Sequence, residues 1–391
     1  RVRGMPTVEA LELGAELARA AMMDAEPAAA APLIEEVLPV AERIGADGVI
    51  AETLATKAWS LTAAGRVREA IAILRGNPIQ TERHGPLRAR LRSSMNLSSH
   101  LTSVDQREAF EVAREGYEVA RRLGHEEWAL SLAGNASENA FDLGEWDWIE
   151  AVAGAHDLEG TDTLFGGVIL VWAAILAAYR GREVEARSTM DRGLAALQAD
   201  DLQVRASRLI GRLALGTATG DPEGGAGALA ELADFGPAVA SGDYDRAVLE
   251  GARLAAWRRR PEVIKEPFDR LAASNGITGG AIVRARIAHQ GALLDLVGGA
   301  DPIAAVERMD AAADVLRTAG SRFQLALARS ERAIFAPDLA GAVEAAGEAR
   351  AILEDLGAVT LLERLEAIHR PADGKVAPTD GVPSVESPAR G

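Results

Sequence analysis

The chain has 391 residues, 48% hydrophobic and 4% aromatic, and 58 acidic against 42 basic side chains give a formal net charge of −16. The apolar content excludes a wholly disordered chain, and the acidic balance argues against nucleic acid or an anionic membrane as the main partner. Because there is no cysteine, disulfides, thiolate metal sites and cysteine nucleophiles are excluded.

The N-terminus predicts a polar helix rather than a secretion signal. Arg1, Val2 and Arg3 lead through Pro6 into this helix, without the apolar core of a signal peptide. An initial Arg in place of Met indicates a fragment of a longer chain. The longest apolar run, residues 164–179, has 16 residues, whereas a membrane span needs about 20. We therefore expect a buried helix there, no membrane association and a cytoplasmic location.

Glycines that follow helix-like segments recur at one or two multiples of about 39 residues. The spacings between successive members of one set are 79, 37, 39 and 78 residues. Glycine adopts the left-handed conformation that ends a helix, so this spacing predicts a structural repeat. The set consists of Gly65, Gly144, Gly181, Gly220 and Gly298.

Each repeat reads as two helices. The first carries large apolar residues three or four positions apart, as in residues 53–64, 128–143, 168–179 and 204–215. The second follows the glycine, as in residues 67–74, 107–123, 183–197 and 303–316, and Asp301 with Pro302 forms a typical start. No segment has the alternation of a strand. We predict an all-α solenoid of about nine hairpins between Thr7 and His369, wound as a right-handed superhelix.

The array is expected to fill residues 1–370 as a single domain. Its weakest repeat is the glycine-rich stretch 222–242, where the superhelix could break. Residues 371–391 contain four prolines, three glycines and no aromatic side chain. Such a composition cannot build a core, so we expect a disordered tail.

Segments 58–70, 141–146 and 175–186 resemble the tetratricopeptide (TPR) pattern. The first has its aromatic residue, its Leu and the Gly with a following Glu-Ala at the helix turn, in Trp59, Leu61, Gly65, Glu69 and Ala70, and the other two keep the aromatic residue and the Gly. TPR units have 34 residues, and the repeats here are longer and vary. The repeats are therefore TPR-like rather than ideal.

Segments 113–124, 135–147 and 349–357 resemble the C-terminal helical-repeat region of class III adenylate/guanylate cyclases of high-GC bacteria, which also carry an AAA-type ATPase module. The ends of LuxR-type regulators with an ATPase core look similar. The first resemblance implies a regulatory module that binds a protein, a peptide or its own N-terminal ATPase and cyclase domains. The second implies a sensor of a small ligand or protein. Neither assigns an oligomeric state.

The residues do not assemble a recognisable catalytic motif. None of Lys57, Lys265 and Lys375 lies in a phosphate-binding loop. The six histidines lack metal-ligand spacing, so we expect solvated or helix-end side chains. The carboxylates around Trp146 and Trp148 read as a solvated turn between helices: Asp142, Glu145, Asp147 and Glu150. We expect no enzymatic activity, no metal and no cofactor in this chain.

One row of polar residues predicts a ligand-binding groove. Lys57, Asn96 and Asn135 are 39 residues apart, each within a first helix, so equivalent positions of neighbouring repeats would align. We call these three residues the polar ladder. Arg88 and Arg92 would add positive charge beside it. Together they would bind a peptide carboxylate or backbone, as the carboxylate clamp of some TPR domains does. The alternative is that the asparagines satisfy buried backbone groups between helices.

Overall fold

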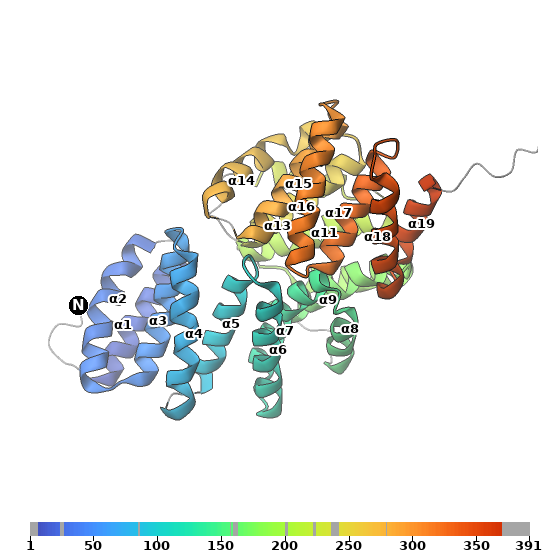
Figure 1. Cartoon of the computed structure of the whole chain (residues 1–391). Coiled ribbons are helices and arrows are strands. Elements are labelled where there is room, and N and C mark those ends of the chain that lie inside the picture. Colours follow the sequence, from blue (N-terminus) through green and yellow to red (C-terminus); the bar gives the residue numbers. More distant parts are fainter. Residues whose placement is uncertain are drawn as a thin grey trace, which may run out of the picture.

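The computed structural model describes residues 7–23, 27–84, 87–156, 158, 163–199, 202–221, 224–235, 242–278 and 280–369. Within these ranges the chain forms nineteen α-helices and one short 3-10 helix, without a strand (Figure 1). The prediction of an all-α fold is confirmed. The helices are α1 (Val8–Met23), α2 (Pro27–Ile44), α3 (Asp47–Ala63), α4 (Val67–His84), α5 (Leu87–Leu101), α6 (Gln106–Arg122), α7 (Glu126–Leu143), α8 (Trp146–Ala155), α9 (Leu164–Tyr179), α10 (Glu183–Ala196), α11 (Leu202–Thr219), α12 (Ala226–Ala233), α13 (Gly242–Trp257), η1 (Pro261–Val263), α14 (Lys265–Thr278), α15 (Ala281–Val297), α16 (Pro302–Thr318), α17 (Arg322–Phe335), α18 (Ala342–Leu356) and α19 (Val359–His369).

Consecutive helices pack as hairpins, from α1 with α2 to α17 with α18, and α19 follows the ninth hairpin of the described chain. We call the odd-numbered helices first helices and the even-numbered ones second helices. Each first helix also packs against the next first helix. This double set of neighbours is the arrangement of a helical solenoid, as the repeat predicts.

Four of the five glycines that the spacing singles out, Gly65, Gly144, Gly181 and Gly220, follow a first helix in the left-handed conformation. Gly144, for example, has a φ of 84°; its N–H donates to the Phe141 carbonyl at 3.3 Å, and the next N–H, of Glu145, donates to the Ala140 carbonyl at 2.8 Å. At the fifth, Gly298, helix α15 ends as predicted, but Gly298 has a φ of −76°, and the next residue, Gly299, takes the left-handed conformation at 86°. The turn after α15 is therefore one residue later than the spacing indicates.

The expected buried helix at residues 164–179 is α9. Its apolar side chains lie in the largest core cluster, and no helix in the described part of the chain is both long and apolar enough to cross a membrane. An aromatic group from α7 to α9 closes this core, with Phe141, Trp146 and Tyr179 packed around Phe323 of α17 at ring distances of 4.8 to 4.9 Å.

The last helices return to the middle of the array. Helix α17 packs against α7, and α19 packs against α9 and α11; Figure 1 shows them beside these middle repeats, while α1 to α6 extend away. Arg364 of α19 donates to the Thr217 and Ala218 carbonyls at the end of α11, both at 2.6 Å. The last carbonyls of a helix have no partner within it, and of these two only Thr217 also accepts from the closing turn, from the Gly220 N–H at 3.3 Å. Helix α19 therefore both covers and caps the middle repeats.

Two predicted features involve residues that the structure does not describe. The stretch 222–242 contains α12, which has only eight residues, but residues 222, 223 and 236–241 are outside the described ranges. The tail at 371–391 also lies outside them. The predicted domain limits therefore stay predictions.

Candidate functional site

The polar ladder lies on three successive first helices. Lys57 is in α3, Asn96 in α5 and Asn135 in α7, and these helices pack α3 against α5 and α5 against α7. The 39-residue spacing therefore does place the three residues on equivalent helices. Their surroundings differ, because Asn96 is buried whereas Lys57 is one-third exposed.

The ladder side chains mostly bind the protein itself. The Asn135 amide donates to the Met95 carbonyl at 3.1 Å and to the Ser98 hydroxyl at 3.2 Å, both in α5. Lys57 Nζ lies 3.3 Å from a carboxylate oxygen of Glu35 in α2. The Asn135 contacts are those of the alternative interpretation, in which the amide satisfies backbone groups between helices.

The two predicted arginines are also paired with acids. Arg88 is largely exposed and lies 3.5 Å from Glu16 of α1. Arg92 forms an ion pair with Glu52 of α3 and donates to the Thr56 hydroxyl at 3.1 Å. Each of the three predicted cations, Lys57, Arg88 and Arg92, thus has a carboxylate beside it, which offsets its attraction for an anionic ligand.

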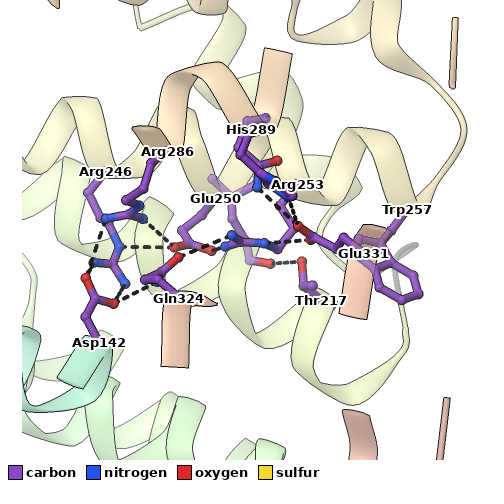
Figure 2. Close-up of polar contacts among 12 residues, drawn as sticks. Asp142, Thr217, Arg246, Glu250, Arg253, Trp257, Arg286, His289, Gln324 and Glu331 are labelled. Carbon is purple, nitrogen blue, oxygen red and sulfur yellow. Dashed lines mark hydrogen bonds and ion pairs between the residues drawn. The ribbon is translucent and has the colours of Figure 1, made fainter. Parts of the chain in front are cut away.

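A buried charged network lies farther along the array and was not predicted. Figure 2 shows it as a row of alternating charges between α7, α13, α15 and α17. These side chains come from first helices, and each has at most 8% of its surface exposed. We call this set the interior network: Asp142, Arg246, Glu250, Arg253, Arg286 and Glu331.

Asp142 forms one end of the interior network. Arg246 donates to both of its oxygens, at 2.8 and 2.9 Å. Gln106 and Gln324 donate one hydrogen bond each, at 2.8 and 2.7 Å. Burial alone would raise the pKa of Asp142, but the guanidinium groups of Arg246 and Arg286 outweigh it and hold the pKa below its usual value. The sequence-based prediction of a solvated turn is therefore wrong for Asp142.

Glu331 forms the other end. It accepts from Arg253 Nε at 2.8 Å and from Trp257 Nε1 at 3.2 Å, and His289 Nε2 lies 2.8 Å from its second oxygen. Burial would raise the pKa of Glu331, but Arg253 and His289 outweigh it and lower the pKa to about 2. The expectation of solvated or helix-end histidines is wrong for His289, which is buried in the middle of α15.

The interior network holds helices together rather than exposing reactive groups. Its carboxylates and guanidinium groups face each other in pairs, and almost none of their surface is open to a substrate. Breaking such a pair leaves a buried charge uncompensated. The network therefore stabilises one arrangement of α7, α13, α15 and α17. No group of three or more potential metal ligands occurs among the described residues.

One signal in the sequence indicates the network. Arg246, Glu250 and Arg253 are four and three residues apart, so they share one face of α13, and that helix is otherwise rich in buried apolar residues. Charges on a face that should be buried imply buried partners. The partners themselves are up to 104 residues away in the chain, and helical spacing does not identify them.

A hollow lies between the first helices α7, α9, α11 and α13. It is about 550 Å³, including space open to solvent. Asn135 of the ladder lines it, together with apolar side chains and two acids, Glu138 and Asp243. Glu138 also touches the interior network, because its Oε1 lies 3.6 Å from Arg246 Nη1. The full lining is Gly134, Asn135, Glu138, Leu164, Phe165, Val168, Val171, Trp172, Gln203, Ser207, Ile210 and Asp243.

Comparison by sequence finds no matching protein-family model and no matching curated protein. Comparison of structures finds similarity to the crystal structure of a Rap protein complexed with competence and sporulation factor. The TM-score is 0.61 at 10% sequence identity, over 92% of this chain and 100% of that chain. At this identity the likeness is one of fold. The chain is a TPR-like all-helical repeat protein, and its resemblance to cyclase-associated repeats stays a prediction.

Proposed function

We propose that the chain is a non-catalytic repeat module that binds a protein or peptide and serves regulation. The observation that carries this proposal is the row of packed first helices from α3 to α13, which ends in the lined hollow. Helical-repeat proteins use extended surfaces of this kind for binding. The Rap protein with the same fold was solved in complex with competence and sporulation factor, which supports a binding role for the fold.

Two further observations support a binding rather than a catalytic role. The buried carboxylates whose pKa values are lowered, Asp142 and Glu331, are occupied by hydrogen bonds inside the interior network. A catalytic group needs access to a substrate, and these two lack it. The hollow, by contrast, is open and combines apolar walls with a few polar groups, as ligand sites do.

We further propose that the module belongs to a larger signalling polypeptide, with its own ATPase and cyclase domains as partners. The support is the sequence resemblance of segments 113–124, 135–147 and 349–357 to cyclase-associated repeats. Sequencing the coding region upstream of Arg1 tests this. A cyclase and a P-loop ATPase are expected, and a helix-turn-helix segment would instead indicate a LuxR-type regulator.

Peptide selection tests the binding function. The purified full chain is used to select from a displayed library of random dodecapeptides, and selected peptides are measured in solution by fluorescence anisotropy. Ser207→Trp fills the hollow, and we expect it to weaken binding at least tenfold. Glu307→Trp places the same bulk on the exposed side of α16 and should leave binding unchanged. The proposal fails if no selected peptide binds in solution, or if both variants bind alike.

The lining of the hollow favours a second candidate function. Small-molecule sites combine apolar walls with a few placed polar groups, and the hollow has such a lining around a free interior of about 50 Å³. A sensor of a small inducer would show thermal stabilisation by a compound and loss of that stabilisation in Ser207→Trp. Compounds that stabilise both forms equally would argue against it.

A further inference from the structure

The composition of the hollow indicates the chemistry of its ligand. None of its twelve lining residues is Lys, Arg or His, whereas Glu138 and Asp243 both bring carboxylates to it. By contrast, Lys57 of the polar ladder and the neighbouring Arg88 and Arg92 each form an ion pair with a glutamate. The hollow is therefore the part of this face whose lining is acidic without a basic residue.

The Glu138 carboxylate keeps most of its hydrogen-bonding capacity. In the described part of the chain its one ion pair is with Arg246, at 3.6 Å, which exceeds hydrogen-bond length. Arg246 itself is committed elsewhere, because it donates to both oxygens of Asp142 and, through Nε, to Glu250 at 3.0 Å. Among the described residues, Arg246 and Arg286 therefore offset the charge of Glu138 only in part, without a hydrogen bond to it.

Burial makes this lack of compensation costly. About a quarter of the Glu138 side chain remains exposed, and burial raises the pKa of Glu138 more than Arg246 lowers it. A cationic group entering the hollow would supply the missing charge and the missing hydrogen-bond donors.

The walls of the hollow can accommodate the apolar part of a cationic side chain. Phe165, Val168 and Trp172 of α9 and Ile210 of α11 line the hollow with apolar surface. The methylene stems of Lys and Arg pack on apolar surface while the charged end reaches a polar group. The Trp172 ring already has the Arg246 guanidinium 4.9 Å from its centroid, so Phe165 is the lining ring that offers a further favourable contact for a cation.

We propose that the hollow binds a Lys or Arg side chain of a peptide that lies along the first helices, with Glu138 as the residue that selects the positive charge. This rests on the proposed peptide-binding function and adds the class of anchor residue that the peptide must carry. Asp243 contributes a second carboxylate to the same lining.

The selected dodecapeptides test this inference. We expect a Lys or Arg at a fixed position in the sequences that bind. Replacing that residue by citrulline, which is uncharged and of similar shape, should weaken binding to the wild-type chain about tenfold, the loss expected for one charge-assisted hydrogen bond. Glu138→Gln should bind the basic peptide about as weakly and should no longer distinguish it from the citrulline peptide.

A matched control is Glu127→Gln, an exposed glutamate on the same helix that does not line the hollow. It should keep the full preference for the basic peptide. If peptides bind without a common basic residue, or if Glu138→Gln keeps the preference, the inference is overturned while the binding function stands. If no peptide binds, the binding function fails, and this inference fails with it.

Discussion

Replacing Asp142 by Asn tests whether the interior network holds the C-terminal half of the array together. The wild-type carboxylate accepts four hydrogen bonds, two from Arg246 of α13, one from Gln106 of α6 and one from Gln324 of α17. Asn has one acceptor oxygen, and its amide group would face donors. Arg246 would then remain buried with part of its charge uncompensated.

The expected loss of stability is about 3 kcal/mol. Removing one partner of a buried ion pair costs roughly 3 to 5 kcal/mol. The lower end applies because Glu250 still accepts from Arg246 and Glu138 lies 3.6 Å away. Domains are commonly stable by only about 5 to 15 kcal/mol, so this loss would be a large part of the total.

Urea unfolding followed by circular dichroism measures the loss. Because repeat arrays do not always unfold in one step, hydrogen exchange should locate it. We expect faster exchange in α6, α7, α13 and α17, which share the Asp142 contacts, and little change in α1 to α4. Asp295→Asn is the control, since it removes an exposed pair with Arg308 and should cost less than about 1 kcal/mol.

Two outcomes would refute this reasoning. One is that Asp142→Asn lowers the free energy of unfolding no more than Asp295→Asn does. The other is an exchange increase spread evenly over the chain, because the network would then not be specific to the closing helices. Combining Asp142→Asn with Arg246→Met removes the uncompensated guanidinium charge. The double variant should therefore lose less stability than the sum of the losses of the two single variants.

Further predictions concern one turn and the response to acid. Gly144→Ala should destabilise by about 2 kcal/mol, because φ is 84° and a Cβ would meet Leu356 at 2.9 Å. Gly124→Ala, with φ 73° and open space, should cost about 1 kcal/mol in urea unfolding; equal losses would contradict the packing argument. Since Arg253 helps to hold the pKa of Glu331 at about 2 despite its burial, stability present above pH 4.5 should fall by about 3 kcal/mol as pH drops to 2. Glu331→Gln should flatten this pH profile.

Much of the fold was predictable because its signals are local. A first helix ends where a glycine takes a left-handed conformation, as at Gly144, and such glycines recur with the repeat. Asp301 caps α16 by accepting from the Ile303 amide at 3.0 Å, as its place before Pro302 predicts. These features depend on residues a few positions apart, so the sequence displays them directly.

The binding face was only partly predictable. Spacing placed Lys57, Asn96 and Asn135 on successive first helices, which the structure confirms. Spacing did not show which polar groups already have partners. The Asn135 amide is used between helices, and Glu138, one helical turn later, faces the hollow with few partners. That distinction depends on neighbours from other repeats.

The sequence by itself determined an all-α stack of hairpins and the helix that carries each ladder residue, because helix periodicity and glycine turns act over short distances. Only the tertiary structure decided that α17 and α19 return to the middle repeats and that Asp142 meets Arg246. Those contacts join residues far apart in the chain. They form only because the curvature of the stacked repeats brings α17 and α19 back to α7, α9 and α11. The interior network, and the hollow beside it, are products of that closure.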